Sequence, residues 1–198
     1  MPGGSTRLTG GSAGAIFYNN TVLSETQAQG ASNVHWANNL FLGENSAPAI
    51  FAINTYTNYS SSDYNGFRPN PGAAFSFAWN APKAGARADY TGPDHRADLD
   101  TRQFKTLDEY KQATGQDQHS VLVDYDVFVN VPKLDALDVK TVQKVYKAED
   151  FDFRVKPGSA AVDRGVALPN VNDGFSGSAP DLGALEVGKP MPHFGPRK

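Results

Sequence analysis

The chain has 198 residues, a formal net charge of -3 and no cysteine. This length suits one domain better than two, and this charge leaves no electrostatic footprint for nucleic acid. The lack of cysteine excludes disulfides, thiolate catalysis and cysteine-bound zinc. Charge is spread unevenly, since residues 1–80 hold only a few charged side chains and the later residues hold all the others. The charged residues before position 81 are Arg7, Glu25, Glu44, Asp63 and Arg68.

Neither end of the chain resembles a membrane or export segment. No apolar stretch reaches the roughly 20 residues of a membrane span. The start, residues 1–7, lacks a basic region followed by an apolar run, so it is not a signal peptide and is typical of the middle of a loop. The tail, residues 188–198, is rich in proline and glycine and is expected to be irregular.

Residues 1–80 contain a short repeated pattern. Aromatic and branched residues surround an asparagine at the same place in three stretches, and short runs of this kind favour a β architecture. The spacings, 19 and 26 residues, suit a solenoid of stacked coils. Asparagine can donate and accept, so Asn20, Asn39 and Asn65 are predicted to form a ladder; chance similarity in an Asn-rich loop is the alternative. The stretches are Phe17-Tyr-Asn-Asn-Thr-Val22, Trp36-Ala-Asn-Asn-Leu-Phe41 and Asp63-Tyr-Asn-Gly-Phe67.

Two later segments sharpen this interpretation. Asp152-Phe-Arg-Val-Lys-Pro-Gly-Ser-Ala-Ala-Val-Asp-Arg-Gly165 and Ala179-Pro-Asp-Leu-Gly-Ala-Leu-Glu186 are similar to the closing segment of many bacterial β-helix proteins. Leu185 stands where an aromatic residue is usual in that pattern. Together with the repeat, these segments make the chain resemble the C-terminal portion of a right-handed parallel β-helix protein of the pectate-lyase-like superfamily.

The resemblance implies a mainly β fold, with the last few coils of a β-helix followed by an irregular cap. It also implies extracellular or periplasmic relatives that act on carbohydrate, and calcium as the one cofactor; the residues themselves indicate none. Such relatives are usually longer. We therefore expect a truncated stack that self-associates through an exposed N-terminal coil or lacks a partner segment. On this basis residues 1–80 form the terminal coils, and residues 81–198 form the capping and closing segment.

The charged second half carries local signals. Thr106 and Glu109 match a capping box, and Gly115 can close the helix, which predicts a helix over about 107–114. Apolar residues alternate with Asp124 and Asp126 over 121–129, which predicts a strand. Residues 131–150 are interpreted as an insertion with a strand or short helix. The stretch Asn170-Val-Asn-Asp-Gly174 is predicted to be a turn.

The densest ionisable cluster contains Asp94, His95 and Arg96. Carboxylates beside Arg and His could position an acidic sugar or bind calcium. A uronic-acid lyase needs a base for the C5 proton and a cation for the substrate carboxylate, and His95 or Arg96 could serve. The alternative is a solvated loop with ordinary charges. No His pairing has metal-ligand spacing, so no metal site is predicted.

A second candidate pair is Asp124 and Asp126, since inverting glycosidases use two carboxylates held apart. An outward polar strand face explains the pair equally well. For sugar binding, the candidates are aromatic residues of the charge-poor region, because such rings stack on sugars as well as in cores. They are Tyr56, Tyr59 and Trp79.

Three functions stay open at this point. The first is a carbohydrate-active enzyme, a polysaccharide lyase or glycoside hydrolase for acidic polysaccharide, with its main active site upstream of this chain. The second is a non-catalytic glycan-binding or adhesin-type surface β-helix. The third is a purely structural capping module. All three exclude nucleic acid and membrane as partners, and the first two predict polysaccharide as the ligand.

Overall fold

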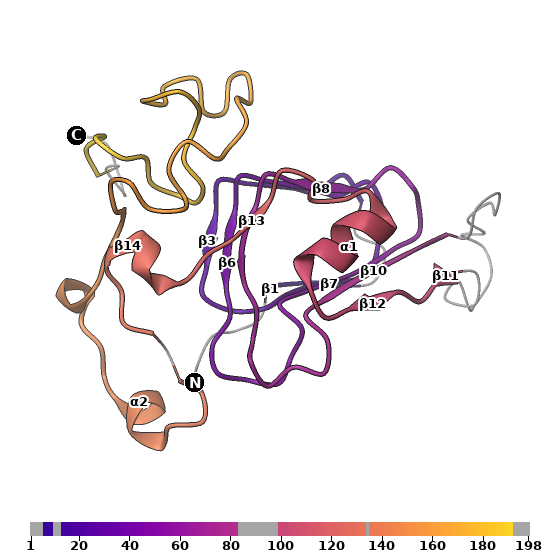
Figure 1. Cartoon of the computed structure of the whole chain (residues 1–198), viewed down its shortest axis with the longest axis horizontal. Helices are drawn as coiled ribbons and strands as arrows, with labels where there is room; N and C mark the ends of the chain where they lie inside the picture. The colour runs from indigo at the N-terminus through magenta and orange to yellow at the C-terminus, as the bar shows by residue number, and fades with distance from the viewer. Residues whose placement is uncertain (1–5, 10–12, 83–98, 134, 192–198) are drawn as a thin grey trace.

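The computed structural model describes residues 6–9, 13–82, 99–133 and 135–191. It is mainly β and contains three sheets of parallel strands (Figure 1). Their strand orders are β1-β4-β7-β10, β3-β6-β9-β13 and β2-β5-β8. The strands are β1 (Thr6–Thr9), β2 (Ile16–Tyr18), β3 (Thr21–Val22), β4 (Thr26–Ala31), β5 (His35–Ala37), β6 (Leu40–Leu42), β7 (Phe51–Thr55), β8 (Ser61–Asp63), β9 (Gly66–Arg68), β10 (Phe77–Pro82) and β13 (Val121–Leu122).

Consecutive strands from β2 to β10 enter different sheets, so each sheet takes every third strand. The chain therefore consists here of three-strand units, namely β2–β4, β5–β7 and β8–β10, each lying against the one before. The register is direct, since Phe17 pairs with Trp36 and Trp36 pairs with Ser62. The expectation of a mainly β chain is thus confirmed, and its parallel pairing comes from the repeat.

An aromatic core fills the space that the three sheets enclose. Phe41 and Phe67 stack with ring centroids 5.5 Å apart, because they occupy equivalent places in neighbouring strands. Phe67 then meets Phe77, and Phe77 stacks on Tyr110 at 5.1 Å. Rings in offset or edge contacts add to the free energy gained by burying their area, so this column ties successive units together.

The parallel pairing does not end at residue 80, where the sequence predicted the regular part to stop. That boundary falls inside β10, and β13 adds a further parallel strand to β9. Beyond β10, β11 (Leu99–Asp100) and β12 (Gln103–Phe104) pair with it in the antiparallel sense. The regular sheets therefore draw strands from both the charge-poor and the charged part of the chain.

The predicted helix is confirmed as α1 (Leu107–Thr114). The Thr106 side chain accepts a hydrogen bond from the Glu109 N–H, and the Glu109 carboxylate accepts one from the Thr106 N–H. Gly115 ends the helix at φ 72°. Leu107 and Tyr110 face inward and join the aromatic core. The helix thereby covers one end of the core, beside β10 and β12 in Figure 1.

The strand predicted over 121–129 is wrong in its middle. Only Val121–Leu122 (β13) pairs with β9, and a 3₁₀ helix follows at Tyr125–Val127 (η2) before β14 (Phe128–Asn130) begins. Asp124 causes the break, since its carboxylate accepts the Tyr125 N–H and caps the 3₁₀ helix. Buried and exposed residues still alternate through this segment, which explains why the pattern was typical of a strand.

A second buried cluster lies on the outer face of the β3-β6-β9-β13 sheet and includes residues from 121–131, 151–162 and 182–187. Leu40, Leu42, Val127 and Leu182 belong to this cluster. Residues 131–150 contain short helices, as expected of an insertion, and residues 170–174 form the predicted turn. Within the described ranges, no helix has the length and apolar character needed to cross a membrane. The remaining elements are α2 (Val139–Gln143), the 3₁₀ helix η3 (Ala148–Asp150) and β15 (Asp152–Val155), which pairs with β14.

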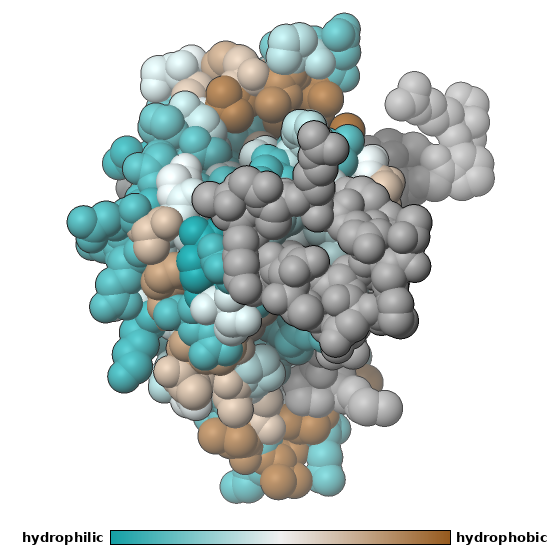
Figure 2. Space-filling model, turned by 90° about the vertical axis from the view of Figure 1, so that its right-hand side faces the viewer, coloured by the Kyte–Doolittle hydropathy of each residue, from teal (hydrophilic) through white to brown (hydrophobic). Residues whose placement is uncertain are grey.

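Seen from the side in Figure 2, the described surface is mostly hydrophilic, with apolar patches toward its two ends. Asn, Ser and Thr supply much of this polarity in the charge-poor part of the chain. Such residues solvate the turns between strands without introducing formal charge.

Candidate functional site

The three repeated asparagines lie in one hydrogen-bonded row at the corner between the β2-β5-β8 and β3-β6-β9-β13 sheets. The Asn39 Oδ1 accepts from the main-chain N–H and the side chain of Asn20, at 3.0 and 2.9 Å. The Asn65 Oδ1 accepts the same two bonds from Asn39. Asn39 and Asn65 are fully buried. The amide side chains therefore satisfy the main chain at each corner.

Two residues continue this row beyond Asn65. The Ser120 Oγ accepts from the Asn65 N–H at 2.7 Å, and the Asp117 Oδ1 accepts from the Asn65 side chain at 3.0 Å. Ser120 also donates to Asp117 at 2.6 Å. A serine and an aspartate thus share the place that a single asparagine holds in each earlier unit.

Burial sets the electrostatics of this end of the row. Desolvation raises the pKa of Asp117, although hydrogen bonds from Asn65, Ser120 and Tyr110 oppose that effect. The pKa of Tyr110 is raised well above its usual value, first by burial and then by the charge of Asp117. Tyr110 donates to the Asp117 Oδ2 at 3.0 Å, which ties α1 to the row.

A second row runs beside the first and consists of the residue before each ladder asparagine. Asn19, Asn38 and Tyr64 all have left-handed backbone conformations, with φ of 54°, 58° and 55°. Among the described residues, every other non-glycine residue with positive φ is Asn or Asp. A bulky residue in this conformation is an outlier, because its side chain clashes where that of asparagine is tolerated.

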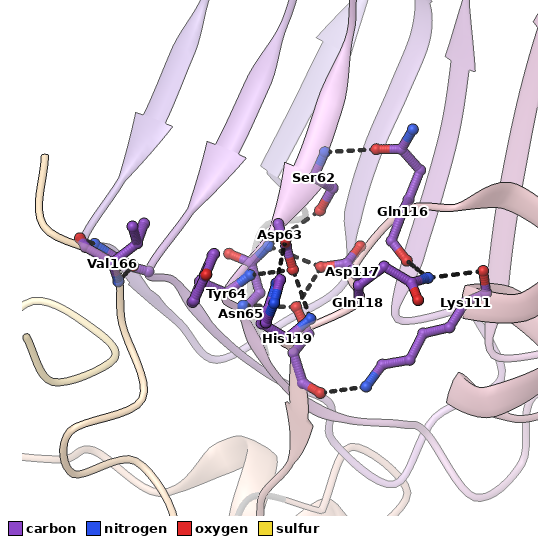
Figure 3. Close-up of polar contacts among 12 residues, drawn as sticks. Ser62, Asp63, Tyr64, Asn65, Lys111, Gln116, Asp117, Gln118, His119 and Val166 are labelled. Carbon is purple, nitrogen blue, oxygen red and sulfur yellow. Dashed lines mark hydrogen bonds and ion pairs between the residues drawn. The ribbon is translucent and has the colours of Figure 1, made fainter. Parts of the chain in front are cut away.

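Tyr64 lies in a partly exposed cluster with Asp63 and His119, which we call the aromatic shelf (Figure 3). The Tyr64 and His119 rings stack with centroids 4.5 Å apart and planes 7° apart. The Asp63 carboxylate accepts the main-chain N–H groups of Tyr64 and His119, both at 2.8 Å, and its Oδ2 lies 2.8 Å from the His119 Nδ1. The His119 side chain is 59% exposed and that of Asp63 is 34% exposed.

The predicted catalytic residues do not form a site in the described structure. Asp94, His95 and Arg96 lie outside the described residues. Asp124 bonds to the buried Arg68 at 2.9 Å and to Lys133 at 3.2 Å.

Asp124 and Asp126 therefore have different surroundings. Burial acts to raise the pKa of Asp124, but hydrogen bonds from Tyr125 and Lys133 and the charge of Arg68 outweigh it and hold the pKa below its usual range. Asp126 is exposed on the 3₁₀ helix. Asp124 caps that helix and anchors Arg68, so its position is explained by structure.

The aromatic residues predicted to bind sugar differ in their exposure to solvent. Trp79 is 3% exposed and meets Trp36 edge to face in the core, so its ring cannot stack on a sugar at the surface. Tyr56 is half-buried and its hydroxyl occupies the space that a Cβ on Gly30 would fill. Tyr59 is 76% exposed.

Sequence reasoning missed the aromatic shelf for two reasons. Tyr64 falls inside the repeat, but its place before the ladder position signals a left-handed turn only when Asn19 and Asn38 are aligned with it. His119 lies 56 residues from Asp63 in sequence, and no local pattern joins them.

Comparison with protein-family models, with curated proteins and with solved structures gives no match to this chain. In the part of the chain that the structure describes, no group of three or more His, Cys, Asp or Glu side chains is placed to hold a metal ion. The calcium that the resemblance implies stays a prediction.

Proposed function

We propose that the chain is a right-handed parallel β-helix domain of a carbohydrate-active protein, and that it binds polysaccharide at the aromatic shelf without cleaving it. The three-strand units, their direct register and the asparagine row support the coil architecture, since each unit buries its apolar face on its neighbours. The single observation that carries the binding site is Tyr64, a strained and partly exposed aromatic residue stacked on His119.

Binding is favoured over turnover because the carboxylates in the closing segment hold the backbone together. The Asp163 Oδ1 accepts the main-chain N–H groups of Ser178 and Ala179, at 2.8 and 3.1 Å. Asp181 accepts from Asp163 and Val187, again through main-chain N–H groups. Together with Asp124, these residues have structural partners that explain their positions. For the carboxylates of the described residues, these structural partners support the glycan-binding alternative over catalysis.

The aromatic shelf has the chemistry that a sugar requires. Aromatic faces take the apolar C–H side of a pyranose ring, while polar groups at the rim bond to its hydroxyls. The His119 ring has one face on Tyr64 and most of its remaining surface in solvent. The Asp63 carboxylate at the rim can accept a further hydrogen bond. This arrangement suits a flexible polymer that passes along an open surface.

The backbone strain at Tyr64 gives the proposal its second support. A left-handed conformation costs an L-residue roughly 1–2 kcal/mol, and asparagine tolerates it best. The equivalent residues, Asn19 and Asn38, avoid much of that cost. Strain that persists at a partly exposed position is typical of functional sites, where the surrounding structure holds the residue in place.

The test replaces Tyr64 with the residue that its equivalents have. Y64N should raise the free energy of unfolding by about 1 kcal/mol, because it relieves the backbone, and should weaken polysaccharide binding by about tenfold. The measurements are urea unfolding and calorimetric titration against neutral and uronic-acid polymers. His35→Ala, which removes a histidine of the same sheet outside the shelf, should bind like the unchanged protein.

Several outcomes would contradict the proposal. If no polymer of the panel binds the unchanged protein, the function fails. If Y64N binds as tightly as the unchanged protein, the aromatic shelf is not the site. Release of unsaturated or reducing sugar ends from any polymer would show that the chain is a lyase or a hydrolase.

A further inference from the structure

The hydrogen bonds of Asp63 fix where the proton of His119 lies. An ionised carboxylate only accepts hydrogen bonds, so the His119 Nδ1 that faces it at 2.8 Å carries the hydrogen. In a neutral imidazole the other nitrogen is then an acceptor. The main-chain N–H groups of Tyr64 and His119 hold the same carboxylate in place. In the neutral form of the ring, the Nε2 of His119 is therefore the acceptor.

Two of the groups that the aromatic shelf offers to a ligand, on His119 and Asp63, are thus acceptors, and the Tyr64 hydroxyl can accept as well as donate. The Nε2 of His119 accepts, and the partly exposed carboxylate of Asp63 accepts. The nearby lysine, Lys111, directs its ammonium to the main-chain carbonyl of Ser120 at 2.6 Å. A ligand that satisfies such groups must donate, and sugar hydroxyls do so.

On this geometry, and resting on the proposed function, we propose that the aromatic shelf selects neutral, hydroxyl-rich polysaccharides over uronic-acid polymers. Asp63 is the residue that determines this specificity, because it sets the tautomer of His119 and supplies a negative charge beside the stacked rings. This proposal replaces the acidic polysaccharides expected from the sequence with neutral ones.

The reasons for rejecting a uronate are electrostatic and geometric. A carboxylate on the sugar ring needs donors, and the His119 nitrogen that faces solvent cannot donate in this tautomer. The like charge of Asp63 would also lie next to it. Specificity of this kind comes from an unpaired acceptor and a repulsive charge facing the wrong ligand.

The first experiment compares matched polymers. Polygalacturonate and alginate are each titrated beside their carboxyl-reduced forms, which keep the backbone and lose the charge. We expect the neutral member of at least one pair to bind about threefold to tenfold tighter, the range that one hydrogen bond accounts for. Equal or tighter binding of the uronate forms overturns the specificity and leaves the proposed function standing. Binding of no polymer at all removes both.

The second experiment changes the tautomer. In D63N the amide oxygen can keep the two main-chain bonds while the amide nitrogen donates to the His119 Nδ1, which moves the ring hydrogen to Nε2. Nitrogen-15 spectra of the imidazole should show His119 protonated at Nδ1 in the unchanged protein and at Nε2 in D63N, with His35 as the internal reference. The preference for the neutral polymer should fall by about threefold to tenfold. An Nε2-protonated ring in the unchanged protein, or an unaltered preference in folded D63N, overturns the inference.

Discussion

Asn39 shows how much one side chain does at the corner of this fold. Its amide oxygen accepts two bonds from Asn20, and its amide nitrogen donates to the Phe17 carbonyl and to Asn65. Only an amide can accept and donate in this way, so serine or aspartate could fill the position only in part. The side chain is fully buried, and its loss would leave these groups without partners.

Asn39→Ala should therefore lower the free energy of unfolding by roughly 1–3 kcal/mol, the cost of burying unsatisfied polar groups. Asn20→Ala is the matched control. Asn20 is only half-buried, so water can replace part of what it loses and the effect should be smaller. Urea unfolding of both variants measures this. An unchanged midpoint for Asn39→Ala would show that the asparagine row adds nothing to stability.

The place of Asp117 and Ser120 in the asparagine row could not be predicted from the sequence. The equal placement of Asn20, Asn39 and Asn65 in the repeat makes their shared role readable from the sequence. The next position is divided between two residues that lie more than 50 places further on. No spacing rule connects such residues, because the connection depends on the path that α1 and its flanking turns take.

Asp117 also makes stability depend on pH. Burial raises its folded-state pKa above the ordinary 3.8, so the folded protein holds this proton more tightly than the unfolded chain. The stabilising contribution is complete below pH 3.8 and is lost as the pH rises through the folded-state pKa. D117N keeps the shape without a charge, and its amide can donate to the Tyr110 oxygen.

We therefore expect the unfolding free energy of D117N, relative to the unchanged protein, to increase from acid to neutral pH and then level off. Taking the difference between the unfolding free energies of the two proteins cancels the contribution of the other titrating groups. Asp117→Ala should instead lose about 2 kcal/mol or more at every pH, since three buried donors lose their acceptor. A D117N difference that stays flat from pH 3 to pH 7 would show that Asp117 does not titrate on folding.

At the scale of elements, local signals account for what the sequence could predict. The capping box at Thr106 and the glycine at position 115 flank the eight residues of α1. The helix could therefore be predicted from local sequence alone. Local signals misplace the segment 121–129, because alternating burial arises in a capped 3₁₀ helix as well as in a strand. Asp124 caps the 3₁₀ helix through the Tyr125 N–H, and Arg68, which lies 56 residues earlier, holds the same carboxylate.

The cap of α1 gives a direct test at this scale. Thr106→Ala removes the acceptor of the Glu109 N–H and should destabilise the chain by about 1 kcal/mol. Because Tyr110 ties α1 to Asp117, the loss should appear in the global unfolding transition as well as in helix content. Gln112→Ala, an exposed change on the same helix, should stay within about 0.5 kcal/mol of the unchanged protein. Equal effects of both variants would mean that the cap is not formed.

For the whole molecule, the decisive feature is one sheet that two cores share. Phe41 and Phe67 point from the β3-β6-β9-β13 sheet into the aromatic core, while Leu40 and Leu42 point from it into the outer cluster. The parallel sheets could be inferred from the repeat. The second buried cluster on the outer face of the sheet could not be inferred. Residues 123–187 have little periodicity, and their contacts depend on the sheet against which they pack.

A shared sheet predicts that both cores unfold together. Leu182 is buried in the outer cluster and belongs to the closing segment, so Leu182→Ala should cost about 2–5 kcal/mol. The loss should shift a single transition, with the same midpoint by tryptophan fluorescence and by far-ultraviolet circular dichroism, since both tryptophans lie in the aromatic core. Val145→Ala, at a position 87% exposed, is the control and should change little. Two separate transitions in Leu182→Ala would mean that the closing segment folds as an independent unit and that the sheet does not couple the two cores.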